Sequence, residues 1–208
     1  MNTELMFDYV VLGGGIVGVS TALSLITKHP DKRILLIEKE ESFAQHQTGH
    51  NSGVIHAGVY YEPGSLKAKF CREGLTETIK FCLLHKIPYQ QCGKLLVATN
   101  DTELKRMKEL YERCKSNDIE VEILNEKTLN EIEPHISGIG ALLVKSTGIV
   151  NYKLITEKMS EQFESLGGMF LLNTKIINLK EDEDKIQIIT SNETFSSRYL
   201  VCCAGLMA

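Results

Sequence analysis

The first forty residues switch between unbroken apolar runs and a helical spacing of apolar positions. The run YVVL predicts a buried strand over 7–12, and a second apolar run predicts another strand over 33–37. Between them, small and apolar residues follow a helical pattern from Ile16 to about His29, where Pro30 stops it. We therefore expect a strand–helix–strand unit at the start of the chain.

Helical spacing returns three more times along the chain. A helix is expected from Ser65 to about Lys86, with apolar residues every three to five positions that define one face. That face comprises Leu66, Phe70, Leu75, Ile79 and Cys82. Asn100 and Glu103 resemble a capping box at the start of the next helix, and Asn151 is an N-cap for the last one. Strand-like runs lie at 93–98, 169–173, 175–179, 185–190 and 199–203, and a strand followed by a short helix is expected over 122–136.

The order of these elements predicts an α/β fold in which a second domain interrupts a Rossmann-like nucleotide-binding domain. We expect residues 1–88 to form the first part of the nucleotide-binding domain and residues 89–147 to form part of an α+β substrate domain. Residues 148–208 then return to the nucleotide-binding domain. The last strand runs into Ala204-Gly205, which places another backbone turn at the carboxyl edge of the sheet, where ligands bind.

Gly13, Gly15 and Gly18 form the spacing G-x-G-x-x-G between the first strand and its helix. The first glycine permits a sharp turn, the second lets a pyrophosphate approach the backbone, and the third lets the helix pack close to its strand. An ordinary turn is the alternative for the glycines alone. Glu38, 20 residues after Gly18, ends the second strand, where a carboxylate can accept both hydroxyl protons of an adenosine ribose. It would repel a 2′-phosphate, which favours FAD or NAD over NADP.

Residues 42–64 form a long stretch rich in Gly, His, Ser and Asn, and long ordered loops of this kind are often functional. His46, His50 and His56 fall within eleven residues. Metal ligation is one interpretation, but no matching Cys or carboxylate spacing accompanies them. We expect a loop that contacts a cofactor and a substrate, and no metal.

Composition narrows the class of protein further. The net charge of −4 gives no electrostatic basis for nucleic-acid binding. Six cysteines without a C-x-x-C pair, and no secretory pattern at the start, favour a reduced, cytoplasmic setting. No apolar run approaches 18 residues, and the first strand begins too early to leave room for a transit peptide.

Four segments together resemble the FAD-dependent oxidoreductases of the D-amino-acid oxidase type. They are the glycine fingerprint with Glu38, the loop HNSGVIHAGVYYEPGSLKAKFCREG over 50–74, the turn STGIVN over 146–151 and the ending VCCAGL over 201–206. The loop is the most specific of them, and within that family it is most similar to the enzymes that oxidise L-2-hydroxyglutarate. The resemblance covers the whole chain. It implies oxidation of this hydroxy acid to 2-oxoglutarate, with a hydride passing to N5 of FAD.

The resemblance also implies which residues hold the cofactor. The residues expected to contact the pyrophosphate are Gly13, Gly15, Ile16, Gly18, Ala204 and Gly205. Glu38 is expected to bind the ribose, and the residues expected near the adenosine are Lys39, His46 and Ile176. Asn51 and Ser52 are expected to contact the pyrophosphate or the flavin. The electron acceptor is left open between oxygen and a quinone. A peripheral contact at the inner face of a membrane would fit a quinone, although no basic amphipathic helix supports it.

On the substrate side, the reaction needs a base near the hydroxyl group and donors for carboxylates. His56, in VIHAG, is expected to act as this base or to contact the substrate, and a histidine that only hydrogen-bonds its loop is the alternative. Tyr60 and Tyr61 could donate to a substrate carboxylate. Arg72 and two lysines on the same helix, Lys67 and Lys69, are candidate anion clamps, although cations on a helix are more often solvated.

Two alternatives stay open. In the first, the flavin enzyme acts on an amine such as glycine or sarcosine, or on glycerol 3-phosphate. The second follows from length, because members of the resembled family are considerably longer than 208 residues. We expect the rest of the substrate domain and a later glycine-rich segment to be missing. The chain would then be a truncated remnant that at most binds a nucleotide.

Overall fold

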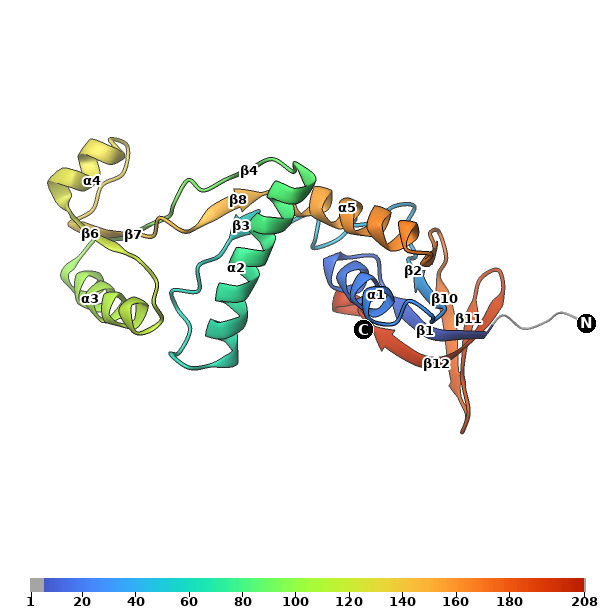
Figure 1. The fold of residues 1–208 in the computed structure, drawn as a ribbon. Coiled ribbons are helices and arrows are strands. Elements are labelled where there is room, and N and C mark those ends of the chain that lie inside the picture. Colours follow the sequence, from blue (N-terminus) through green and yellow to red (C-terminus); the bar gives the residue numbers. More distant parts are fainter. Residues whose placement is uncertain (1–5, 208) are drawn as a thin grey trace, which may run out of the picture. The chain divides into compact units, whose positions relative to one another are not determined.

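Figure 1 shows the computed structural model, which describes residues 6–207. The chain divides into two compact units. Unit 1 combines the described residues up to Ser52 with those from Asn151 onward, and unit 2 is Gly53–Val150. The sequence predicted the first division at 88/89, but the structure puts it at 52/53. Residues 53–88 belong to unit 2 because Ala57, Val59 and Leu75 share a core cluster with Cys114 and Val144.

Unit 1 is built on a six-stranded sheet with the order β10-β11-β12-β1-β2-β9. Its parallel part consists of β1 (Met6–Leu12), β2 (Ile34–Ile37), β9 (Met169–Leu171) and β12 (Thr194–Cys202). The antiparallel part is the hairpin of β10 (Ile176–Glu181) and β11 (Ile186–Thr190). The helices are α1 (Ile16–Lys28) and α5 (Tyr152–Ser165), which pack against each other, and a short 3-10 turn, η1 (Gly205–Met207), follows β12.

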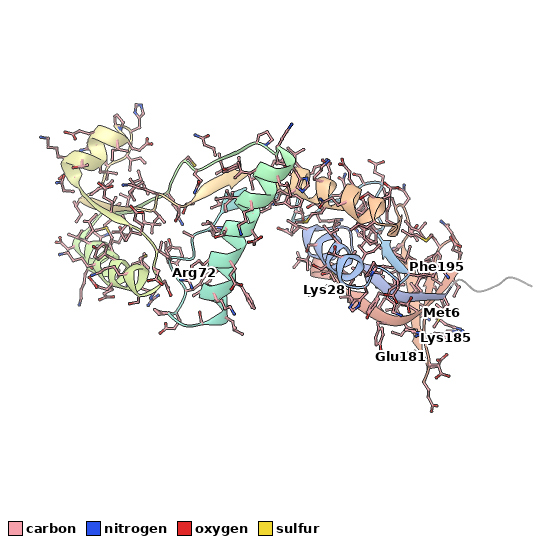
Figure 2. The ribbon with its side chains drawn as sticks, viewed as in Figure 1. Met6, Lys28, Arg72, Glu181, Lys185 and Phe195 are labelled. Atoms are coloured by element: carbon pink, nitrogen blue, oxygen red, sulfur yellow. The ribbon has the colours of Figure 1, made fainter. Side chains whose placement is uncertain are left out.

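Apolar side chains cover both faces of this sheet, as expected for parallel strands. All four residues of β2 are buried. On one face Val11 packs with Val19 of α1 and Phe163 of α5. On the other face Phe7 meets Phe195 (labelled in Figure 2) edge to face, with ring centroids 6.1 Å apart. The predicted α/β fold with a Rossmann-like parallel core is therefore confirmed.

Unit 2 contains two three-stranded antiparallel sheets and three helices. One sheet has the order β3-β8-β4, formed by β3 (Val54–Ile55), β8 (Gly148–Val150) and β4 (Tyr89–Gln90). The other has the order β5-β7-β6, formed by β5 (Leu95–Ala98), β7 (Gly140–Leu143) and β6 (Glu122–Asn125). The helices are α2 (Leu66–His85), α3 (Asp101–Ser116) and α4 (Glu126–Ile132). Unit 2 is thus the α+β insertion that the sequence predicted between two parts of the nucleotide-binding fold.

The buried face of α2 differs from the predicted one. Leu66 and Phe70 are 68% and 61% exposed, whereas Cys82 is fully buried. A helix turns by about 100° per residue, so Leu66 lies roughly 180° away from Leu75 and cannot share its face. The single apolar face predicted for this helix is therefore wrong. In the described part of the chain, no helix combines the length and apolarity that crossing a bilayer requires.

Candidate functional site

A turn of three glycines joins β1 to α1 at the carboxyl edge of the unit 1 sheet. Gly13 has φ +107°, and a Cβ there would lie 2.3 Å from the carbonyl oxygen of Cys203. A Cβ on Gly18 would lie 1.8 Å from the carbonyl oxygen of Gly13. These contacts let the helix and the turn after β12 approach the end of β1 as closely as the glycine fingerprint predicted.

The middle glycine of the turn, Gly14, is as constrained as its neighbours, although the sequence did not single it out. A Cβ on Gly14 would lie 2.7 Å from Cδ1 of Phe43 and 2.9 Å from Cγ of Glu38. The Gly14 amide donates to Oε2 of Glu38, and the Glu40 amide donates to Oε1 at 2.9 Å. The Glu38 carboxylate is thus buried and held by two backbone amides at the end of β2. Each oxygen keeps a second lone pair for a further donor such as a ribose hydroxyl.

The loop after β2 returns to the glycine turn and fixes its position. The Ala44 amide donates to the Gly14 carbonyl at 3.0 Å, with Ala44 itself in a left-handed conformation. Oγ1 of Thr48 accepts the amide hydrogen of Ile16, the first residue of α1, at 2.9 Å. Sequence reasoning missed Thr48. Its only signal was a hydroxyl side chain in a loop, and nothing in the pattern shows which loop residue reaches the helix.

The N-terminus of α1 keeps backbone donors free at this turn. Gly15 is the N-cap and supplies no side-chain cap. Within residues 6–207, the amides of Gly15 and Val17 have no hydrogen-bond partner. Unpaired amides and the positive end of a helix dipole suit phosphate oxygens. The glycine turn with its free amides therefore fits the pyrophosphate of a dinucleotide.

Charged side chains gather just beyond Glu38. Oε1 of Glu40 accepts from Nζ of Lys39 at 2.7 Å and lies 2.8 Å from Nε2 of His46. The hydrogen bond from Lys39, with that from His46, holds the pKa of Glu40 below its ordinary value. The same hydrogen bond raises the pKa of Lys39. The structure thus brings Lys39 and His46, both expected near an adenosine, together on one carboxylate.

The other polar residues of the loop bond to the loop itself. Nδ2 of Asn51 donates to the carbonyls of Gln47 and Thr48 at 3.0 and 2.7 Å, and Nδ1 of His50 lies 3.0 Å from the carbonyl of His46. Ser52 is exposed at the end of the first chain segment of unit 1. Across the described residues, no group of three or more His, Cys, Asp or Glu side chains is arranged to hold a metal ion.

The turn after β12 lies beside the glycine turn. The Cys203 amide donates to the Leu12 carbonyl at 2.7 Å, and Cα of Ala204 would lie 3.4 Å from a Cβ on Gly13. Gly205 follows with φ +63° and open space around it. Ala204 therefore lies beside the glycine turn, and its contact with the pyrophosphate stays a prediction.

Ile176 opens β10, and its side chain packs on the core face that contains Phe7. Two residues earlier, the Thr174 amide donates to the Glu38 carbonyl at 2.9 Å. The segment leading to Ile176 therefore passes the end of β2, where an adenosine is expected.

The predicted substrate residues all belong to unit 2. The imidazole of His56 is exposed and has no hydrogen-bond partner among the described residues, so the structure gives no support to a purely loop-bonding role. Tyr60 and Tyr61 are 57% and 37% exposed. Arg72, labelled on α2 in Figure 2, is not a free cation, because its Nη1 lies 3.2 Å from Oδ2 of Asp118. Lys69 lies 3.9 Å from Glu73, and Lys67 is exposed.

Comparison with known proteins identifies the class. Residues 8–208 match the DAO family of FAD dependent oxidoreductases, and the chain belongs to this family. FAD is the cofactor of the family, and the glycine turn, the free amides and the Glu38 carboxylate of unit 1 fit it.

Individual relatives agree with this assignment. The chain is 50% identical, over 98% of its length, to L-2-hydroxyglutarate dehydrogenase of Escherichia coli K12. It is 43% identical, over 97% of its length, to the mitochondrial L-2-hydroxyglutarate dehydrogenase of Caenorhabditis briggsae. In both cases the match covers 48% of the relative, so the chain spans about half the length of these curated relatives.

Solved structures share the fold. L-alpha-glycerophosphate oxidase from Mycoplasma pneumoniae, with FAD bound, superposes with a TM-score of 0.84 at 25% identity, over 94% of this chain and 53% of that one. Glycine oxidase from Geobacillus kaustophilus gives a TM-score of 0.88 at 18% identity, over 99% of this chain and 57% of that one.

Proposed function

We propose that this chain carries the FAD-binding part of an oxidoreductase that converts L-2-hydroxyglutarate to 2-oxoglutarate. The proposed substrate rests on the 50% identity, over 98% of the chain, to an L-2-hydroxyglutarate dehydrogenase. The structurally similar glycine oxidase and L-alpha-glycerophosphate oxidase are only 18% and 25% identical to this chain. An amine or glycerol 3-phosphate is therefore the weaker candidate for the substrate.

The cofactor would lie along the carboxyl edge of the unit 1 sheet. Bound FAD supplies the acceptor for the two electrons and the hydride of the oxidation. The free amides of Gly15 and Val17 would donate to the pyrophosphate, beside Ala204. Glu38, already fixed by two amides, would accept the ribose hydroxyls. Lys39 and His46, which both contact Glu40, would lie near the adenosine. Asn51, Ser52, Gly205 and the backbone of Ile176 complete the proposed set of contacts.

His56 is the proposed base for the substrate hydroxyl. It is an exposed imidazole with both ring nitrogens free among the described residues, and imidazole exchanges a proton near neutral pH. Tyr60 and Tyr61 follow it in the same segment and would supply phenolic donors. A cytoplasmic location, and oxygen or a quinone as the electron acceptor, remain predictions.

Titration of the purified chain with FAD, read by flavin fluorescence, tests the cofactor site. Glu38→Ala should weaken FAD binding by about 1–3 kcal/mol, the worth of a charged hydrogen-bond partner. Glu41→Ala removes an exposed carboxylate three residues away and should leave the affinity unchanged. Gly15→Val should abolish binding, because its side chain would fill the approach to the turn where Thr48 Oγ1 already lies 3.3 Å from a Cβ. Equal affinities in all four proteins would remove the glycine turn and Glu38 from the site.

The substrate is tested by anaerobic bleaching of the flavin-loaded protein. L-2-hydroxyglutarate should bleach the flavin spectrum, whereas glycine, sarcosine and glycerol 3-phosphate should not. Bleaching by one of those three alone would replace the proposed substrate with it. A chain that binds FAD but is bleached by none of the four would lack the proposed activity. Reoxidation of the bleached protein by air or by a soluble quinone then identifies the acceptor.

A further inference from the structure

The segment of unit 2 that carries His56, Tyr60 and Tyr61 is held in place on both sides. Ala57 and Val59 are buried at 7% and 5% exposure, whereas His56 before them and Tyr60 after them are exposed. The Tyr61 amide donates to the Gly58 carbonyl at 3.1 Å and closes a turn. The Cys71 thiol of α2 donates to the His56 carbonyl at 3.2 Å, and burial raises its pKa, which keeps the donor proton in place.

Two side chains from the end of α3 fix the turn from another element. Nη1 of Arg113 donates to the Tyr60 carbonyl at 3.2 Å, and Nδ2 of Asn117 donates to the Tyr61 carbonyl at 2.9 Å. The Tyr60 side chain remains 57% exposed. Its backbone is therefore anchored while its ring and hydroxyl face outward.

A second cation, on the residue just before β5, reaches the same tyrosine. Nζ of Lys94 lies 5.1 Å from the centroid of the Tyr60 ring. The Lys94 backbone is bonded in both directions to Val144, at 3.1 and 2.9 Å, so the backbone that carries this side chain is fixed. A cation over an exposed ring gains only about 0.5–1 kcal/mol, which leaves most of the ammonium's hydrogen-bonding capacity unused.

These two cations lack acidic partners, unlike three other cations of unit 2. Arg72 is paired with Asp118, Lys115 with Glu112, and Lys145 with Glu122. Neither Lys94 nor Arg113 forms an ion pair with a carboxylate among residues 6–207. Both cations contact Tyr60 without a counter-charge, and a bound anion would supply one.

We propose that Lys94, Arg113 and the hydroxyl of Tyr60 form a carboxylate-binding subsite on unit 2. The ammonium offers three donors, the guanidinium keeps the donors that do not reach the Tyr60 carbonyl, and the phenol adds one more. The three groups come from the residue before β5, from α3 and from the turn held by Arg113 and Asn117, so little reorganisation of the backbone is needed on binding. The ligand class rests on the proposed function, which supplies a substrate with two carboxylates. Arg72, already paired, is not part of this subsite.

Glutarate, a plain dicarboxylate without a reactive hydroxyl, is the probe for the test. Two-dimensional NMR of the 15N-labelled chain, titrated with glutarate at constant ionic strength, should show saturable shifts at Tyr60 and Lys94. Lys94→Gln and Arg113→Gln should each weaken binding about tenfold or more, the loss expected for one ionic hydrogen bond. Arg72→Gln is the matched control and should bind within about twofold of the parent chain.

The Lys94 side chain makes no hydrogen bond within the described chain, so Lys94→Gln is not expected to disturb folding. A backbone spectrum that matches the parent away from Tyr60 verifies this. The absence of saturable shifts, or equal affinities in the parent, Lys94→Gln and Arg72→Gln proteins, would overturn the subsite. FAD titration of the same samples reports on unit 1 separately. A parent chain that binds FAD but gives no saturable glutarate shifts therefore refutes the subsite alone, whereas a parent chain that fails to bind FAD refutes the proposed function.

Discussion

At the residue scale, the glycine turn shows how one backbone position serves several contacts. Gly14 donates its amide to Glu38 and leaves no space for a Cβ, because Phe43 and Glu38 pack against its Cα. The loop that contains Phe43 can lie over the turn only because this position has no side chain. Gly14 therefore couples the cofactor cradle to the hydrophobic core.

This coupling predicts the effect of Gly14→Ala. The added methyl group would lie 2.7 Å from Phe43 and 2.9 Å from Glu38, so we expect a loss of about 1–3 kcal/mol in the free energy of unfolding. Gly74→Ala is the control, because Gly74 lies on exposed α2 with nothing within 4 Å of a Cβ. It should be neutral or stabilising by about 0.5–1 kcal/mol. Urea unfolding of both variants measures the difference, and equal effects would show that Gly14 is not sterically constrained.

Glu40 yields a prediction on pH. Its pKa lies below the ordinary value because Lys39 and His46 hydrogen-bond its carboxylate. The carboxylate therefore stabilises the fold at pH values above the pKa of the unfolded chain. This contribution is lost as the pH falls through the lower, folded pKa. Carboxyl 13C NMR should show the Glu40 titration moving to higher pH in Lys39→Met, but not in Lys32→Met, whose lysine pairs with Asp8 and Asp31. An unmoved midpoint in Lys39→Met would contradict the assigned cause.

The sequence reached some of these residues and missed others for a physical reason. Gly13, Gly18 and Glu38 follow from spacing, because strand, turn and helix lengths fix where they lie. Gly14 and Thr48 depend on where the loop after β2 returns, about thirty residues along the chain from the turn. Loop paths of that length leave no periodic signal, so only the three-dimensional structure identifies these two residues.

At the element scale, two helices that the sequence predicted from the same kind of apolar spacing bury their aromatic residues to different extents. α5 buries Phe163 completely in the core of unit 1, where its ring occupies the space beside Gly168. α2 leaves Phe70 61% exposed on the side opposite Leu75. Hydrophobic spacing located both helices, but an interval of five residues between Phe70 and Leu75 was too loose to define one face.

A matched pair of substitutions measures this difference. Phe163→Ala should cost about 3–5 kcal/mol of unfolding free energy, because it removes a fully buried ring. Phe70→Ala makes the same chemical change on an exposed face and should stay within about 0.5 kcal/mol of the parent chain. Thermal or urea unfolding of the two variants gives the comparison. A large loss in Phe70→Ala would mean that this face is covered in solution.

The sequence also missed the short strand β7 and misplaced the start of the long strand β12. β7 has four residues, GALL, and is paired on both sides by β5 and β6. β12 begins at Thr194, five residues before its predicted start, and Ser196 and Ser197 are buried within it. Polar residues in a strand carry no alternation signal, although their backbones pair with β1 and β11. Pairing across the sheet, which the sequence does not encode locally, decides these boundaries.

At the scale of the whole molecule, the cofactor cradle lies within one unit. Gly13, Glu38, Thr48 and Ala204 belong to unit 1, although they come from both of its chain segments. His56 and the proposed carboxylate subsite belong to unit 2. With the residue roles proposed above, the interrupted order of elements would separate cofactor binding from substrate recognition along the chain.

This separation predicts that unit 2 can be removed without loss of the cradle. The Val150 amide donates to the Gly53 carbonyl at 2.8 Å, so the chain enters and leaves unit 2 at neighbouring points. A Gly/Ser linker of about four residues, within the usual length of a connection, should join Ser52 to Asn151. We expect the shortened chain to keep the two core clusters of unit 1 and to bind ADP, which carries only the adenine, ribose and pyrophosphate of FAD.

Isothermal titration with ADP provides the measurement, with the full chain as reference. The two affinities should agree within about 1 kcal/mol, because the residues proposed to contact ADP all lie in unit 1. Glu38→Ala in the shortened chain is the control and should lower its affinity as it does in the full chain. A shortened chain that is folded by circular dichroism but does not bind ADP would show that unit 2 supplies part of the cradle. The proposed division between cofactor and substrate units would then be wrong.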